Sequence, residues 1–138
     1  MKLAEALKLG LVKDVPKPER HIETWLSDVF LYENTARKIT KYVSNKDFGD
    51  LTNFEERKQF YAADFAWNNL FAPEIYTFLQ GLRETKNGWV ECNNDEANDF
   101  YILMNRINAD DTLINTAGLF YNKFIIKAIL LAHFSITS

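Results

Sequence analysis

A lysine in an extended segment and an acidic residue in the helical segment that follows it are the side chains of this sequence best suited to chemistry. Lys38 lies in residues 36–43, a run that favours a strand, and Asp64 lies in the helix predicted after it. A fixed ammonium group suits phosphate oxygens, because phosphoryl transfer depends on positioning and charge stabilisation. A strand lysine followed by an acidic residue on the next helix indicates a phosphate-binding site. The same two residues could also be a strand lysine that faces solvent and a polar residue on an amphipathic helix.

The elements that must position these residues begin with three short extended segments. Residues 21–24, 28–32 and 36–43 are rich in Ile, Val, Phe and Thr and are separated by short polar breaks. Strands this close in sequence predict an antiparallel meander. The turn-rich residues 44–50 are expected to form a loop that leads into a helix.

The helix that carries Asp64 has recognisable ends. Thr52 and Glu55 have the spacing of a capping box, in which each side chain satisfies the backbone amide of the other. Aromatic and polar residues then recur at three- and four-residue spacing as far as Phe71, and Pro73 stops the helix shortly after. We therefore expect a helix that packs one face on a sheet.

Two further strand regions follow the helix. Residues 75–84 and 88–92 flank an Asn87-Gly88 pair, which favours a tight hairpin turn. Residues 100–107 form an apolar run that turns polar only near Asn105 and Arg106, as expected of a central strand that emerges at its end.

The ends of the chain are predicted to be helical. Residues 1–9 form a short amphipathic helix that Gly10 terminates, expected to serve as a lid or docking segment, and the proline-containing residues 15–18 form a linker. Residues 108–112 can cap a short helix, and residues 122–134 predict a strongly apolar one. Residues 1–19, 20–107 and 108–138 are thus expected to be the three parts of one domain.

Composition excludes several classes of function. A chain of 138 residues with 14% aromatic residues can bury one core, and a net charge of −3 without a basic stripe argues against a nucleic-acid partner. Cys92 is the only cysteine, so an internal disulfide is impossible and a reducing, cytoplasmic location is expected. His21, His133 and Cys92 lack the spacing of a zinc site. No apolar run approaches the ~20 residues needed to cross a bilayer, so we expect no membrane association.

Several motifs together resemble one known family. The order of elements and the motifs resemble the N-terminal lobe of the aminoglycoside-phosphotransferase-like family of bacterial kinase-like proteins, and most closely its uncharacterised branch, which is often fused to an ATP-binding domain. The resemblance covers about residues 20–107. The motifs that carry it are RHIET (20–24), VFL (29–31), A-x-K-I-x-K (36–41), D-L-T-x-F-E-x-R (50–57) and APEIY (72–76).

The resemblance implies roles for Lys38 and Asp64. In this family the lysine of the third strand pairs with the α- and β-phosphates of ATP and is held by an acidic residue, usually glutamate, on the next helix. Asp64 occupies that helix position, and its shorter side chain requires a closer approach of helix and strand or a bridging water. Side-chain alternation places Lys38 and Thr40 on one face of their strand and Ile39 on the other.

The resemblance places three more residues at the nucleotide. Ser27 lies in the connection between the first two strands, where kinase-like lobes lay a loop over the phosphates, although a plain turn fits equally and no glycine-rich loop is present. Met104 and Arg106 lie where the hinge backbone would bind adenine. Almost any side chain would serve at those positions.

The sequence lacks the catalytic parts that this family needs. Phosphoryl transfer requires a second lobe with a catalytic aspartate and a magnesium-binding aspartate, and the sequence contains no His-x-Asp motif. Asp110 and Asp111 are better explained as caps. We therefore expect an α+β protein with a sheet of about five antiparallel strands and one packed helix. It would bind ATP, with magnesium only beside a second lobe. The alternative is a freestanding regulatory module that pairs with itself or another protein through residues 122–134.

Overall fold

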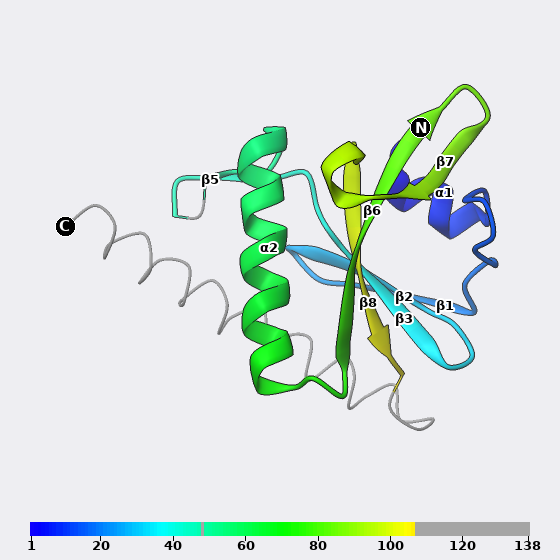
Figure 1. Ribbon diagram of the computed structural model, residues 1–138, viewed down its shortest axis with the longest axis horizontal. Helices are drawn as coiled ribbons and strands as arrows, with labels where there is room; N and C mark the ends of the chain where they lie inside the picture. The colour runs from blue at the N-terminus through cyan, green and yellow to red at the C-terminus, as the bar shows by residue number, and fades with distance from the viewer. Residues whose placement is uncertain (48, 107–138) are drawn as a thin grey trace.

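The computed structural model describes residues 1–47 and 49–106 and has an α+β fold (Figure 1). Its main sheet has six antiparallel strands in the spatial order β1-β2-β3-β8-β6-β7. These strands are β1 (Arg20–Glu23), β2 (Ser27–Leu31), β3 (Thr35–Thr40), β6 (Tyr76–Thr85), β7 (Gly88–Cys92) and β8 (Asp99–Asn105). The α+β class is thus confirmed, and the sheet has one strand more than expected.

The first three strands form the predicted meander. Val29 of β2 lies opposite Lys38 of β3, which in turn lies opposite Ile102 of β8, so β3 is an interior strand. The connection between β1 and β2 is a turn closed by Thr24, whose hydroxyl accepts hydrogen bonds from the amides of Leu26 and Ser27. Ser27 is therefore the first residue of β2.

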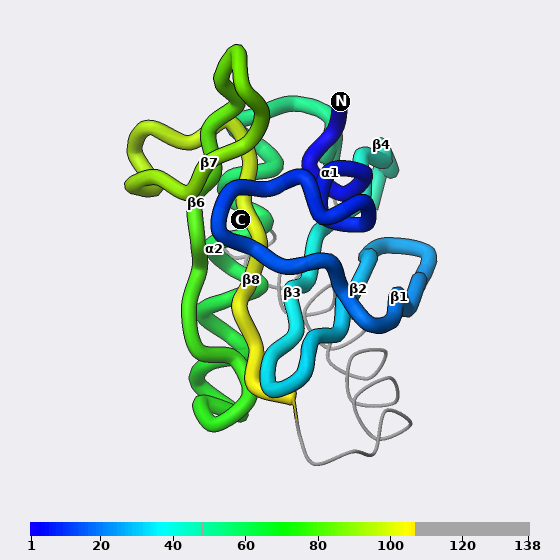
Figure 2. The backbone as a smooth tube through the Cα atoms, turned by 90° about the vertical axis from the view of Figure 1, so that its right-hand side faces the viewer, coloured from blue at the N-terminus to red at the C-terminus, as the bar shows by residue number. Residues whose placement is uncertain are grey.

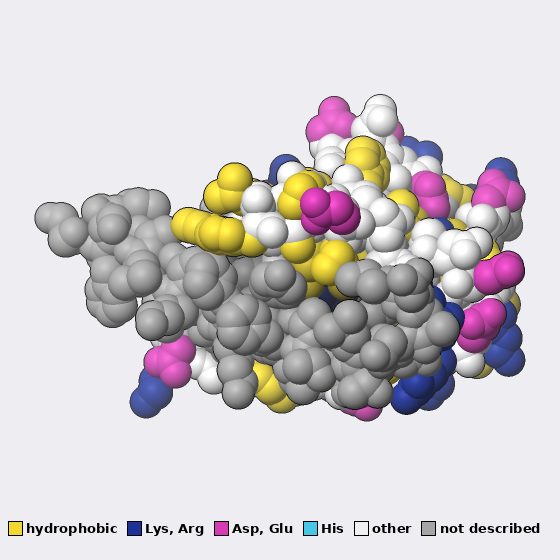
Figure 3. Space-filling model, turned by 90° about the horizontal axis from the view of Figure 1, so that it is seen from below, with side chains coloured by type: hydrophobic (Ala, Val, Ile, Leu, Met, Phe, Trp, Pro, Cys, Tyr) yellow, Lys and Arg dark blue, Asp and Glu magenta, His cyan; other side chains and the backbone are white. Residues whose placement is uncertain are grey.

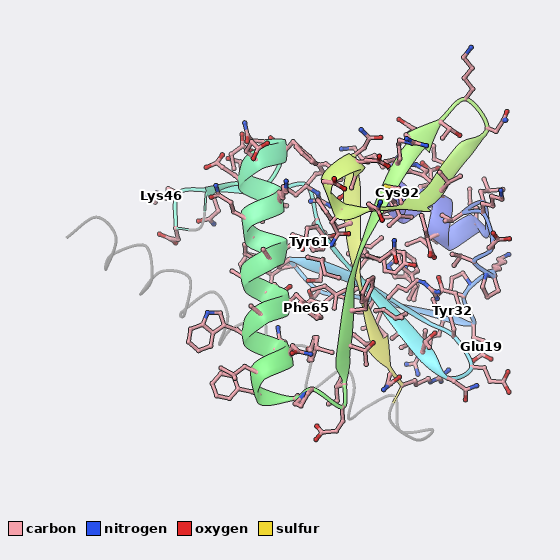
Figure 4. All side chains as sticks on the ribbon, in the orientation of Figure 1. Glu19, Tyr32, Lys46, Tyr61, Phe65 and Cys92 are labelled. Carbon is pink, nitrogen blue, oxygen red and sulfur yellow. The ribbon has the colours of Figure 1, made fainter. Side chains whose placement is uncertain are left out.

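Helix α2 (Phe54–Phe71) packs on one face of the sheet, and Figure 4 shows Tyr61 and Phe65 on the side that faces it. The predicted capping box is wrong. Asn53 is the N-cap, and its side chain accepts from the amide of Glu56 at 3.1 Å. Thr52 is bound instead through its amide and hydroxyl to the Asp50 carboxylate, which holds it in the preceding turn.

Helix α1 (Leu3–Leu9) covers the opposite face, so the sheet lies between the two helices (Figures 1 and 2). Leu3, Ala6 and Leu7 are buried in one cluster with Phe30 and Ile39 of the sheet. Gly10 ends the helix as expected, in the left-handed conformation with φ of 72°. Because its apolar face is part of the core, α1 is a packed layer and not a lid.

The predicted hairpin and central strand are both present. Strands β6 and β7 are joined by a turn at Lys86 and Asn87, but the positive φ of 106° falls on Gly88, the first residue of β7. Strand β8 lies between β3 and β6. Residues 44–50, expected to be a loop, contain the small strand pair β4 (Ser44–Asn45) and β5 (Gly49–Asp50), and a short 3-10 helix, η1 (Asn94–Glu96), precedes β8.

The helices predicted for residues 108–112 and 122–134, with Asp110, Asp111 and His133, lie outside the described residues. Neither helix of the described chain has the length and apolar character that a bilayer crossing requires. Large hydrophobic side chains are exposed on the described surface, among them Leu70 and Phe71 on α2 and Phe78 on β6. Hydrophobic side chains also reach the face seen from below (Figure 3).

Candidate functional site

The side chains of Lys38 and Asp64 meet between β3 and α2. The ammonium nitrogen of Lys38 lies 3.1 Å from Oδ2 and 3.3 Å from Oδ1 of Asp64. Ile39, the next residue of β3, is buried on the α1 side of the sheet, so alternation turns Lys38 toward α2 as predicted. Asp64 reaches Lys38 directly, which means that helix and strand approach closely enough for the shorter acid.

Both members of this ion pair are buried. Lys38 and Asp64 are each only 1% exposed. Taking two charges out of water is costly, and the pair repays it only when its remaining hydrogen-bonding atoms are also satisfied. Asn68 supplies part of this, because its Nδ2 donates to Oδ1 of Asp64 at 2.6 Å. The Lys38 ammonium also lies 5.9 Å from the centroid of the Tyr76 ring.

Asp64 belongs to a stripe of buried polar side chains on α2, which we call the polar stripe. Its members recur at three- and four-residue spacing, so they share one face of the helix. The polar stripe consists of Arg57, Tyr61, Asp64 and Asn68, each no more than 2% exposed. Buried polar groups need hydrogen-bond partners, and Arg57, Tyr61 and Asp64 find theirs on β3, whereas Asn68 bonds to Asp64 of its own helix. The position of α2 on the sheet is therefore specified by hydrogen bonds as well as by apolar packing.

Arg57 forms a second buried ion pair, with Asp99 at the start of β8. Its Nε donates to Oδ1 of Asp99 at 2.9 Å, and Tyr42 donates to Oδ2 of the same carboxylate at 2.5 Å. Burial opposes the charge of the guanidinium, but the interactions with Tyr61 and Asp99 outweigh it and raise the pKa of Arg57 above its ordinary value. For Tyr61 and Tyr42 burial raises the pKa, because it disfavours the negatively charged phenolate.

No sequence motif indicates the Arg57–Asp99 pair. Arg57 falls on the same helical face as Tyr61 and Asp64, which is the one available signal that it points toward the sheet. Its partner follows much later in the chain, and no local pattern joins them. The pair was therefore missed.

Ser27 and Met104 lie on the same face of the sheet as Lys38. Ser27 is opposite Thr40, and Met104 is opposite Ala36, so both residues follow the alternation that turns Lys38 toward α2. The side chains of Ser27 and Met104 are buried, and Met104 is part of the core cluster beneath α2. Each of them lies two residues along its strand from the residue opposite Lys38, which is Val29 on β2 and Ile102 on β8.

Arg106 lies apart from Lys38. Its Nη1 donates to Oε2 of Glu19 at 2.8 Å and to the carbonyl of Tyr32 at 2.7 Å, and its amide donates to the carbonyl of Asn34. These bonds tie the end of β8 to the turn between β2 and β3. Of the five residues predicted at the nucleotide, the structure joins Lys38 and Asp64 directly and places Ser27 and Met104 on their face of the sheet.

The described residues include one histidine, His21, and one cysteine, Cys92. His21 lies 2.7 Å from the Asp28 carboxylate and stacks on Phe30. Cys92 is a free thiol whose pKa burial raises above its ordinary value. Within residues 1–47 and 49–106, no three side chains of the types His, Cys, Asp and Glu gather into a potential metal site.

No protein-family model, curated protein or solved structure matches the chain. Clues to function therefore come from the sequence motifs and from the geometry around Lys38.

Proposed function

We propose that this chain is the nucleotide-binding lobe of an aminoglycoside-phosphotransferase-like small-molecule kinase, and that Lys38 is the cation for the α- and β-phosphates of ATP. The observation that carries the proposal is the direct, buried contact between Lys38 on β3 and Asp64 on α2. The family resemblance in the sequence implies the same pair. Phosphoryl-transfer sites need such a cation, because charge neutralisation and positioning supply most of the catalysis.

The arrangement of elements gives further support. A three-strand meander is followed by a helix and then by three more strands of the same sheet, the hairpin of β6 and β7 and then β8, which pairs with β3. This is the order that the resemblance implies for a kinase-like N-terminal lobe. Such likeness supports a site hypothesis and does not by itself establish an activity.

The residues around Lys38 fit the phosphates of a nucleotide better than they fit a metal ion. The lysine ammonium is a cation that only donates hydrogen bonds, so it suits phosphate oxygens and cannot act as a ligand of a metal ion. The Asp64 carboxylate is engaged by Lys38 and Asn68 and is not open for Mg²⁺. Because Lys38 is only 1% exposed, phosphate binding requires the side chains around it to rearrange. Magnesium binding and the catalytic aspartate are assigned to a second lobe.

The alternative function is a non-catalytic binding or regulatory module that acts through a protein partner. The burial of Lys38 favours it, because an ion pair closed to solvent can serve the fold alone. Under this alternative, the chain has a kinase-like lobe without nucleotide affinity.

Titration of the full chain with a fluorescent ATP analogue, with and without Mg²⁺, tests the proposal. The key variant is Lys38→Met with Asp64→Asn, which removes both charges together and so avoids leaving one of them buried alone. The proposal predicts saturable binding by the wild type that this double variant loses while still folded. Lys58→Met is the matched control, because Lys58 is exposed on α2. Equal binding by the wild type and the double variant, or no binding by the wild type, would overturn the proposal.

A further inference from the structure

The polar stripe of α2 forms bonds to two residues of β3, Lys38 and Thr40. Asp64 binds Lys38. Nη2 of Arg57 donates to the carbonyl of Thr40 at 2.6 Å, and the amide of Thr40 donates to the Tyr61 hydroxyl at 2.7 Å. Thr40 and Lys38 lie on the same face of the same strand. The bonds to Thr40 therefore set how far α2 stands from β3 where Asp64 must reach Lys38.

Arg57 is also held by Asp99, the first residue of β8. Nε lies 2.9 Å from Oδ1 and Nη2 lies 3.4 Å from Oδ2 of Asp99, so the guanidinium fork engages both carboxylate oxygens. Asp99 also accepts from the amide of Phe100 and the hydroxyl of Tyr42. Nη1 of Arg57 donates to the carbonyl of Lys41 at 3.2 Å. Arg57 thus links α2 to the beginning of β8 and to the end of β3 at once.

This link matters more for an aspartate than for a glutamate. The side chain of Asp64 is shorter by one carbon–carbon bond, about 1.5 Å, than that of a glutamate at the same position. A retreat of α2 by about that length would break the direct contact with Lys38. Glutamate at the same position would tolerate such a retreat, because its carboxylate reaches farther from the helix.

We propose that Arg57 and Asp99 are positioning residues that hold α2 close enough to β3 for Asp64 to bind Lys38. Their first effect is on the ion pair itself. Their effect on nucleotide affinity rests on the proposed function. The same two residues are buried and contribute to stability, so the test needs a readout that stability alone does not move.

The test compares Asp99→Asn, Asp64→Glu and the variant that combines the two, in the full chain. Asp99→Asn keeps the shape of the side chain and removes its charge. The first readout is the Lys38 ammonium signal in a proton–nitrogen correlation spectrum, which is observable when an ion pair and burial slow proton exchange with water. The second readout is the affinity for the fluorescent ATP analogue. Asp95→Asn, an exposed carboxylate of η1, is the matched control.

Asp99→Asn is expected to abolish the Lys38 ammonium signal and to lower nucleotide affinity about tenfold. Adding Asp64→Glu should restore the signal and bring the affinity to within about threefold of the wild type. Asp64→Glu alone should increase neither the signal nor the affinity above those of the wild type. An Asp99→Asn protein that keeps the wild-type signal, or a combined variant without recovery, would overturn the proposal. If the wild type binds no nucleotide, the proposed function fails while the ammonium signal still decides the positioning role. If Asp99→Asn does not fold, Tyr42→Phe, which removes one donor to Asp99, should weaken the same signal.

Discussion

Replacing Lys38 alone should destabilise the protein far more than an ordinary lysine substitution does. Lys38→Met leaves the Asp64 carboxylate buried without its cation, and only the Asn68 amide then remains of the side chains that bind it among the described residues. Breaking a buried ion pair in this way costs about 3–5 kcal/mol. Since whole domains are stable by only about 5–15 kcal/mol, this loss is a large fraction of the total.

The variant that combines Lys38→Met with Asp64→Asn allows a more specific prediction for the free energy of unfolding. With Lys38→Met and Asp64→Asn together no charge remains, and the residue at position 64 still offers an acceptor to Asn68. The buried NH2 group of the new amide then replaces a carboxylate oxygen that had accepted from Lys38, and burying it without an acceptor costs about 1–3 kcal/mol. If Asp64→Asn alone also costs about 3–5 kcal/mol, the two single losses exceed the double loss by about 3 kcal/mol or more.

Urea unfolding at pH 7, followed by tryptophan fluorescence, measures these free energies of unfolding. Lys58→Met, on the exposed face of α2, should change the free energy by no more than about 0.5 kcal/mol. Single variants at Lys38 and Asp64 that each cost less than about 1 kcal/mol, the range of solvent-exposed pairs, would refute the reasoning. Additive losses in the double variant would refute it as well.

Three further predictions follow from the fold. Gly81→Ala should cost about 1–3 kcal/mol in urea unfolding, since the new Cβ would lie 2.9 Å from Cβ of Ala97 and 3.0 Å from the backbone Cα of Asn94; an unchanged midpoint would contradict these contacts. Asn53→Ala should cost about 0.5–2 kcal/mol, because the amide of Glu56 loses its cap, and unchanged thermal unfolding would argue against the cap. Burial raises the pKa of Tyr61, so the folded state keeps a proton that the unfolded chain releases above its ordinary pKa of 10.0. Stability present below pH 10 should therefore fall as pH rises further, and Tyr61 should contribute up to about 1.4 kcal/mol per pH unit to that slope beside Tyr42 and Tyr101, whose pKa values burial also raises. Tyr61→Phe should reduce the slope by about that amount; equal slopes would exclude the role of Tyr61.

Local patterns predicted most elements of this fold. The meander, the helix ending at Phe71, the hairpin and the strand now called β8 were all visible as runs of strand formers, helical spacing or turn residues. The start of α2 was misplaced by one residue, because Asp50 binds Thr52 and leaves Asn53 to cap the helix. Competition between neighbouring side chains for the same amides is difficult to judge from sequence.

At the candidate site, contacts between residues far apart in the sequence could not be predicted from local sequence patterns. Lys38 and Asp64 were paired only through the family resemblance, since strand alternation could give the direction of Lys38 but not its partner. Arg57 and Asp99 were not paired at all, because their contact depends on how α2 lies across the sheet. Arg106 was placed at the nucleotide by its position after a strand, whereas its side chain binds Glu19.

The most direct test of the central claim is to find which lysine touches the nucleotide phosphates. An ATP analogue with an acyl group on its terminal phosphate forms an amide with the nearest lysine amine and releases ATP, and mass spectrometry of the digested protein identifies that lysine. We predict that Lys38 is acylated first and that excess ATP protects it. Labelling spread over exposed lysines such as Lys58, with no protection by ATP, would contradict the assignment of Lys38 as the phosphate-binding cation.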